Sequence, residues 1–266
     1  MTRDDAWDPA QYERFRDERT RPFLDLLALV RPRAGMRVVD LGCGTGELTA
    51  RLHHELAARE TLGIDRSEAM LARARPLAEG GLRFEAGDIA AFAARAAYDL
   101  VFSNAALHWV DDHAALFARL TAGLGAGGQL AVQMPANFDH PSHVVAAQVA
   151  GEAPFRDALG GHARTGRAVL RPEEYALLLE RLGYAEQHVR LQVYGHRLAA
   201  RDEVVEWVKG SLLTDYQRRL PPELYARFVA RYRERLLPAL EETRPYFFTF
   251  KRVLLWAQRE IQRRAG

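Results

Sequence analysis

Three glycines on alternate positions, Gly42, Gly44 and Gly46, follow an apolar run that ends at Asp40 and are the residues best placed to do chemistry. Because glycine has no Cβ, such a turn presents backbone N–H groups to a ligand at the start of a helix. The spacing G-x-G-x-G is not the dinucleotide pattern G-x-G-x-x-G, and the Gly-Lys-Ser or Gly-Lys-Thr ending of a P-loop is missing. The carboxylate of Asp40 would repel phosphates, so it suits a ligand that bears an ammonium and a sulfonium better than one that bears a pyrophosphate.

Further polar residues follow the next three apolar runs of the chain. We expect Asp65 to accept both hydroxyls of a ribose, and Asp88 to accept the exocyclic amine of adenine, with Ile89 against the ring. Asn104 and Trp109 come after the fourth run. Each residue alone is typical of a strand end or a helix cap. Together they predict one ligand site along the carboxyl edge of an open sheet.

The elements that position these residues alternate between apolar runs and amphipathic stretches. This period predicts an α/β fold, in which a parallel sheet has helices on both faces. Strands are expected at 36–41, 61–65, 82–86, 98–103 and 130–134, helices at 47–58, 67–78 and 112–124, and a turn at 125–128.

The rest of the chain is predicted to be more helical. A helix is expected from Asp8 to Val30, and the weak periodicity of 136–171 indicates an inserted segment. Later elements are expected as helices at 172–182, 201–213 and 223–237 and strands at 186–194 and 246–256. We interpret residues 1–266 as a single domain, with an N-terminal helical lid at 1–35 and a cofactor-binding core at 36–135.

Composition limits the partners that this chain is expected to have. Its 37 basic and 35 acidic residues leave a net charge of +2, which gives no broad positive field for nucleic acid. Its one cysteine, Cys43, excludes an internal disulfide. No metal site is expected, because His53 and His54 have no third ligand at a useful spacing and are interpreted as part of a solvated helix face. Neither a signal peptide nor an apolar span of about 20 residues is seen, so a cytoplasmic protein without membrane contact is predicted. We expect a small-molecule substrate and a monomer or homodimer.

Five stretches of the chain form a recognisable set. They are the glycine turn at 39–46, Gly-Ile-Asp at 63–65 with Ser67, Ala69 and Met70, the opening from Trp7 to Pro22, 130–135 with Asn137, and 205–210. This set resembles class I S-adenosylmethionine-dependent methyltransferases, and among them the trans-aconitate 2-methyltransferases. The resemblance covers nearly the whole chain.

The resemblance implies a Rossmann-like fold with a seven-stranded, mostly parallel sheet, an antiparallel last strand and a helical substrate cap at 137–170 and 199–243. It implies S-adenosyl-L-methionine as the cofactor and transfer of its methyl group to a small carboxylic acid, with trans-aconitate or a related polycarboxylate as the first candidate. The cofactor-binding residues are then expected to be Asp40, Gly42, Gly44, Gly46, Asp65, Met70, Asp88, Ile89 and Asn104. The substrate-binding residues are expected to be Tyr12, Arg19, Arg21, His108, Trp109 and Asn137.

No residue is assigned a certain catalytic role, because a carboxylate nucleophile needs no general base. Tyr12, His108 and Trp109 are expected only to position the substrate. Two departures from the family bear on the substrate. The usual Gly-Leu-Arg-Pro run is replaced by Ser-Leu-Leu-Thr at 211–214, which removes an arginine. The family's Phe-Pro-Arg-Leu-Phe pattern near the C-terminus is replaced by Phe-Thr-Phe-Lys-Arg at 248–252.

Three alternatives remain open at the level of the sequence. The enzyme could methylate oxygen or nitrogen of a neutral metabolite, with His108 as general base. The fold could bind the cofactor as a sensor without catalysis. The glycine turn alone is also compatible with an NAD-linked dehydrogenase, although its spacing and Asp40 argue against one.

Overall fold

The computed structural model describes residues 16–166 and 168–261, with side chains from Thr20 onward. The described chain forms two compact units. The helical unit is built from residues 136–166 and 193–251, and the sheet unit from 19–135, 168–192 and 252–261.

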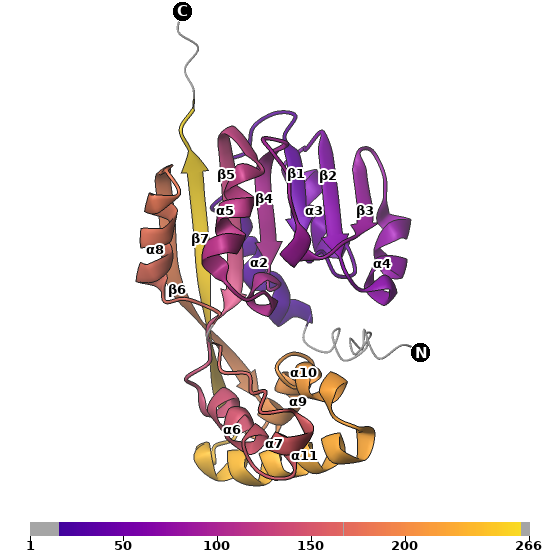
Figure 1. The fold of residues 1–266 in the computed structure, drawn as a ribbon, viewed down its shortest axis with the longest axis vertical. Helices are drawn as coiled ribbons and strands as arrows, with labels where there is room; N and C mark the ends of the chain where they lie inside the picture. The colour runs from indigo at the N-terminus through magenta and orange to yellow at the C-terminus, as the bar shows by residue number, and fades with distance from the viewer. Residues whose placement is uncertain (1–15, 167, 262–266) are drawn as a thin grey trace, which may run out of the picture. The chain divides into compact units, whose positions relative to one another are not determined.

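A seven-stranded sheet has the strand order β3-β2-β1-β4-β5-β7-β6 (Figure 1). Its strands are β1 (Arg37–Leu41), β2 (Glu60–Asp65), β3 (Leu82–Ala86), β4 (Tyr98–Asn104), β5 (Leu124–Pro135), β6 (Tyr184–Leu198) and β7 (Tyr246–Arg259). The first five strands pair in parallel, and β7 runs antiparallel to β5. The predicted fold class is therefore confirmed.

Helices cover both faces of this sheet, with α5 and α8 drawn in front of it in Figure 1 and α2 behind it. Phe23 of α2 and Leu52 of α3 pack in one core with Leu100 of β4. On the opposite face, Tyr175 of α8 lies 5.3 Å from Phe117 of α5, ring centroid to ring centroid. The helices of the sheet unit are α2 (Arg16–Leu27), α3 (Glu47–Glu55), α4 (Glu68–Ala74), α5 (His113–Ala122) and α8 (Pro172–Arg181), with short 3-10 turns η1 (Arg75–Leu77), η2 (Ile89–Ala91) and η3 (Leu107–Trp109).

The helical unit has a core of its own. Phe228 of its longest helix contacts the rings of Phe155 and Tyr216, and the hydroxyl of Tyr232 donates to the carbonyl of Ser142 at 2.9 Å. Its helices are α6 (Pro141–Ala150), α7 (Phe155–Ala158), α9 (Glu203–Lys209), α10 (Leu213–Arg219) and α11 (Pro222–Leu236), followed by η4 (Leu237–Ala239).

Three local predictions are wrong. Residues 125–128 do not form a turn outside the sheet. They belong to β5, which begins at Leu124 and pairs with β4 in an irregular register at this point. The helix expected at 201–213 ends at Lys209, and the chain restarts as α10 at Leu213. His53 is buried instead of solvated, since its ring makes a 2.9 Å hydrogen bond with Thr61.

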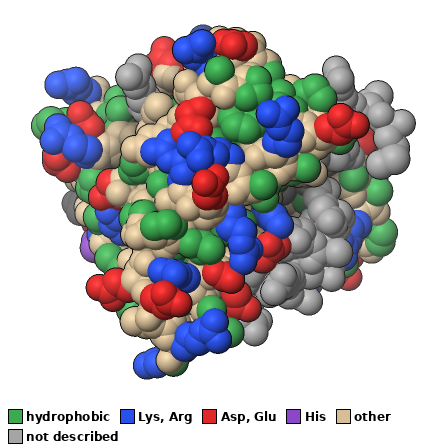
Figure 2. Space-filling model, turned by 90° about the horizontal axis from the view of Figure 1, so that it is seen from below, with side chains coloured by type: hydrophobic (Ala, Val, Ile, Leu, Met, Phe, Trp, Pro, Cys, Tyr) green, Lys and Arg blue, Asp and Glu red, His purple; other side chains and the backbone are tan. Residues whose placement is uncertain are grey.

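The surface visible in Figure 2 carries basic and acidic side chains side by side, without a large area of one sign. The ion pairs of α11 follow this pattern, since Arg231 and Arg235 both pair with Glu152. No helix within 16–166 and 168–261 combines the length and the apolar composition needed to cross a membrane.

Candidate functional site

The glycine turn joins β1 to α3 in a conformation that needs glycine. Gly42, Gly44 and Gly46 have φ angles of 84°, 57° and 80°, in the left-handed region. A Cβ on Gly42 would lie 2.2 Å from the Cβ of Ala106, so this glycine allows the loop after β4 to approach. No described atom lies within 4 Å of a Cβ built on Gly44, so that position faces open space.

Asp65 ties the end of β2 to this turn. Its Oδ2 accepts the N–H of Gly44 at 2.9 Å, and its Oδ1 accepts the N–H of Ser67 at 2.9 Å. A carboxylate oxygen has two lone pairs, so both oxygens keep an acceptor site for a ligand hydroxyl. The predicted ribose acceptor thus also holds the glycine turn in place.

Asp40 is a buried carboxyl group beside the turn, with 4% of its surface exposed. Its Oδ2 accepts the hydroxyl of Thr49 at 2.6 Å, whereas its Oδ1 is buried without a hydrogen-bond partner in the described residues. Burial raises the pKa of Asp40 to about 7, and the negative charge of Asp65 adds to the rise, which the hydrogen bond from Thr49 opposes. Asp40 is therefore poised to receive a positive charge.

The end of β4 presents a second acceptor next to Asp40. The Oδ1 of Asn104 is buried without a hydrogen-bond partner within 16–166 and 168–261. Ala105 follows with a φ of 57°, which is rare for a residue with a Cβ, and its N–H donates to the carbonyl of Gln133 at 2.8 Å. Such local strain is often kept at functional sites.

The turn after β4, η3, carries the two aromatic residues predicted to line the substrate site. The rings of His108 and Trp109 lie 4.9 Å apart, and both residues are half-buried. The turn is held by the buried ring of His113, which makes hydrogen bonds with the Leu107 carbonyl at 3.1 Å and with the Tyr175 hydroxyl at 2.5 Å. Burial lowers the pKa of His113, so its ring is neutral and serves as a brace.

The remaining cofactor residues lie around the ends of β2 and β3. The exposed Asp88 caps η2 by accepting the N–H of Ala90 at 2.8 Å, and the Cδ1 of Ile89 lies 3.5 Å from the position of a Cβ on Gly42. Met70 is buried, and its N–H donates to the Oγ of Ser67 at 3.3 Å. Ile89 thus leans over the glycine turn, whereas Met70 packs into the core.

For the other predicted substrate residues, no contact of the described residues places them at this edge. Arg21 is exposed on α2, and Asn137 belongs to the helical unit, where its Oδ1 accepts the N–H of Lys251 at 3.0 Å. Tyr12 and the side chain of Arg19 lie outside the described residues. The substrate roles of these four residues stay predictions.

Comparison with known proteins shows the family to which this chain belongs. The model of a family described as a methyltransferase domain matches residues 32–176. The trans-aconitate 2-methyltransferase of Deinococcus radiodurans is 44% identical over 259 residues, which cover 96% of this chain and 98% of the relative. That of Streptomyces avermitilis is 41% identical over 263 residues, covering 96% and 97%. The chain belongs to the S-adenosylmethionine-dependent methyltransferase family.

Solved structures agree with this methyltransferase in fold. The YcgJ protein of Bacillus subtilis superposes with a TM-score of 0.60 at 14% identity, covering 91% of this chain and 99% of its own. A phosphoethanolamine N-methyltransferase of Haemonchus contortus, solved with S-adenosyl-L-methionine, has a TM-score of 0.53 at 16% identity and covers 91% and 52%. The predicted enzyme class and cofactor are thus confirmed.

The sheet edge of the methyltransferase fits this cofactor. The partnerless oxygens of Asp40 and Asn104 are acceptors suited to an ammonium or a sulfonium, and the open space at Gly44 admits a ligand against the backbone. Sequence reasoning missed two residues that arrange the site: Thr49, which orients Asp40, and His113, which braces η3. A hydroxyl or an imidazole inside an amphipathic helix gives no sign of such a contact.

The raised pKa of Asp40 predicts that the methyltransferase binds S-adenosylmethionine more weakly in acid. Below pH 7 the free protein holds a proton on Asp40, which must leave before the carboxylate can face the cation. The ionised fraction of a group with this pKa falls about 25-fold between pH 7.5 and pH 5.5, and we expect the affinity to fall by up to that factor. Isothermal titration calorimetry in two buffers of different ionisation enthalpy should show a proton released near pH 6, and an equal affinity at the two pH values would contradict this assignment.

Proposed function

We propose that this methyltransferase transfers the methyl group of S-adenosylmethionine to a carboxylate of trans-aconitate and forms its methyl ester. The observation that carries the proposal is the identity of 39–44% to relatives named trans-aconitate 2-methyltransferase, in alignments that cover 86–96% of the chain and hence both units. An enzyme is favoured over a sensor, since these relatives are named as methyltransferases and cover both units of the chain.

The mechanism follows from the charges at the sheet edge. A carboxylate is already a nucleophile, so the protein has no proton to remove and its task is alignment. Asp40 and Asn104 would fix the positive end of the cofactor, and the glycine turn with Asp65 would fix its ribose. His108 and Trp109 would wall the acceptor side of the edge and exclude water, which strengthens each of these electrostatic contacts. The roles of residues 1–35 as a lid and of 137–170 and 199–243 as a cap stay part of this proposal.

A labelled-methyl assay tests the proposed substrate. The purified chain is incubated with S-adenosylmethionine labelled at the methyl group and a panel of di- and tricarboxylic acids, and the products are separated. We expect label in an ester of trans-aconitate, released by mild base. Label in a base-stable ether or amine product would support a neutral acceptor instead, and cofactor binding without labelled product from any acceptor would support a sensor.

The pH dependence of turnover separates the carboxylate acceptor from the neutral one. With His108 as a required base, the rate would fall as a group with an ordinary pKa of about 6.5 is protonated. Under the proposal, a His108→Gln variant keeps the shape of the pH profile, because substrate ionisation and Asp40 control it. A profile that loses its acid limb in this variant would show that His108 is a base.

A further inference from the structure

Four polar side chains form a row along the carboxyl edge of the sheet, on one face. Asp40 and Phe102 are paired neighbours on β1 and β4, Asn104 pairs with Gln133 on β5, and Gln133 pairs with Leu254 on β7. Paired residues of neighbouring strands point to the same face, as do residues two positions apart. Asp40, Asn104, Gln133 and Arg252 therefore follow one another across β1, β4, β5 and β7.

This row changes from acceptors to donors along its length. Its first half holds the partnerless oxygens of Asp40 and Asn104. Its second half holds Gln133, which has no exposed surface, and Arg252, which has 6% exposed. An Nη1 hydrogen of Arg252 is donated to the Oε1 of Gln133 at 3.3 Å.

The contact with Arg252 fixes the direction of the Gln133 amide. A guanidinium only donates hydrogen bonds, so the amide atom that faces Arg252 must be the oxygen. The Nε2 of Gln133 then points the other way, where it is buried without a hydrogen-bond partner among the described residues. Leaving a buried amide donor unsatisfied costs free energy, which makes a ligand that accepts from it the natural explanation.

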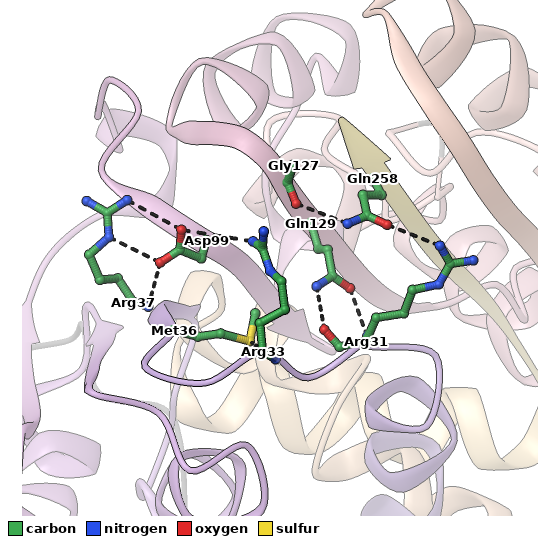
Figure 3. A network of polar contacts seen from close by, with 8 residues as sticks. All are labelled: Arg31, Arg33, Met36, Arg37, Asp99, Gly127, Gln129 and Gln258. Carbon is green, nitrogen blue, oxygen red and sulfur yellow. Dashed lines mark hydrogen bonds and ion pairs between the residues drawn. The ribbon is translucent and has the colours of Figure 1, made fainter. Parts of the chain in front are cut away.

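A second glutamine on the same strand and face shows what a structural role looks like. Gln129 is also fully buried, four residues from Gln133 at the opposite edge of the sheet. Both ends of its amide are satisfied, since Nε2 donates to the Arg31 carbonyl at 2.7 Å and Oε1 accepts from the Trp256 indole at 2.8 Å (Figure 3). The neighbouring Gln258 likewise donates to Gly127 and accepts from Arg31. Among the three glutamines of this sheet that are buried, Gln133 alone therefore has an unsatisfied amide in the described residues.

We propose that Gln133 and Arg252 form the subsite that binds a carboxylate of the methyl acceptor. An amide N–H and a guanidinium are donors suited to a carboxylate, and charge-assisted hydrogen bonds of this kind are the strong ones. The row then orders the reactants as transfer requires, with the cationic cofactor over Asp40 and Asn104 and the anionic acceptor over Gln133 and Arg252. This inference rests on the proposed carboxylate acceptor and assigns it two residues that sequence reasoning did not select.

The test is the change Gln133→Glu, which keeps the size of the side chain, removes the donor and places a negative charge beside Arg252. A matched control is Gln129→Glu, the same change on the same strand and face. Binding of trans-aconitate to the protein loaded with S-adenosylhomocysteine is measured by calorimetry, and KM and kcat are measured separately with S-adenosylmethionine. We expect Gln133→Glu to weaken acceptor binding and raise its KM by roughly 10-fold to 100-fold, the usual range for a hydrogen bond to a charged group, with cofactor affinity changed less than about threefold.

The control variant is expected to unfold at a lower temperature and to keep the acceptor KM. If Gln133→Glu does not fold, Gln133→Met removes the donor without adding charge and should also raise the KM for the acceptor.

An unchanged acceptor KM in a folded Gln133 variant, or an equal rise in Gln129→Glu, would overturn the subsite while leaving the proposed reaction in place. Weakened trans-aconitate binding without turnover in the parent enzyme would keep the subsite and overturn the reaction, and neither binding nor turnover would overturn both.

Discussion

Replacing Gly44 with valine is expected to weaken the binding of S-adenosylmethionine strongly. A Cβ at this position meets no described atom within 4 Å, so the added side chain would occupy the space in which the cofactor approaches the backbone. Filling the space that a ligand needs costs on the order of 1–3 kcal/mol, which corresponds to a loss of affinity of roughly 5-fold to 150-fold. Calorimetric titration of the variant with S-adenosylmethionine measures this loss directly.

A control is needed because valine is strained at the positive φ of Gly44. Gly80→Val imposes the same strain, since Gly80 has a φ of 51° and also faces open space, at a loop that precedes β3. Both variants should lose a similar amount of thermal stability, and only Gly44→Val should lose the cofactor. Equal cofactor affinity in the two variants would show that Gly44 does not border the ligand.

Asp40→Asn is expected to change binding and stability in opposite directions. The amide keeps an oxygen for Thr49 and turns an NH2 group toward the place of the cofactor cation. Affinity should therefore fall by roughly 10-fold to 100-fold, the size of a lost charge-assisted hydrogen bond. The ligand-free protein should become more stable above pH 7. Calorimetry and thermal unfolding at pH 5 and pH 8 measure the two effects.

The sign of the stability change follows from the raised pKa of Asp40. The folded protein holds the Asp40 proton more tightly than the unfolded chain, whose pKa is near 3.8. The contribution of this group to stability is therefore highest at low pH and falls as the pH rises from about 4 to about 7. The asparagine variant cannot lose stability in this way, because its side chain does not ionise. Each tenfold difference in proton affinity between the folded and unfolded states corresponds to about 1.4 kcal/mol of the free energy of unfolding. Asp112→Asn, a change of an exposed helix cap, should leave both measurements near those of the parent protein, and a less stable Asp40→Asn protein at pH 8 would refute the account of Asp40.

The first four strands and the polar residues at their ends were predictable from sequence. In a parallel sheet, alternating strands and helices bring the carboxyl end of every strand to one edge. The position of Asp40, Asp65 and Asn104 at the ends of apolar runs was therefore enough to predict that they lie at this edge. The start of a helix at Ser67 was likewise predictable, and Ser67 caps this helix by accepting the N–H of Met70. These inferences depend on local patterns alone.

The second half of the polar row was not predictable in this way. Gln129 and Gln133 are the same residue type on the same strand and face, and only the partners that distant parts of the chain bring to each of them decide which amide is satisfied. Arg252 is almost at the other end of the chain from Asp40, and its position beside Gln133 follows from the register of β7 on β5. His53 was misjudged for the same reason, because its partner Thr61 lies on a neighbouring strand. Cross-strand contacts of this kind become visible only in the folded chain.

The most direct test is a crystal structure of the enzyme with S-adenosylhomocysteine and trans-aconitate. The account predicts the amino end of the cofactor beside Asp40 and Asn104, its ribose at Asp65, and an acceptor carboxylate within hydrogen-bond distance of Gln133 and Arg252. A cofactor bound away from the glycine turn, or a substrate with no carboxylate at the end of β5, would contradict it.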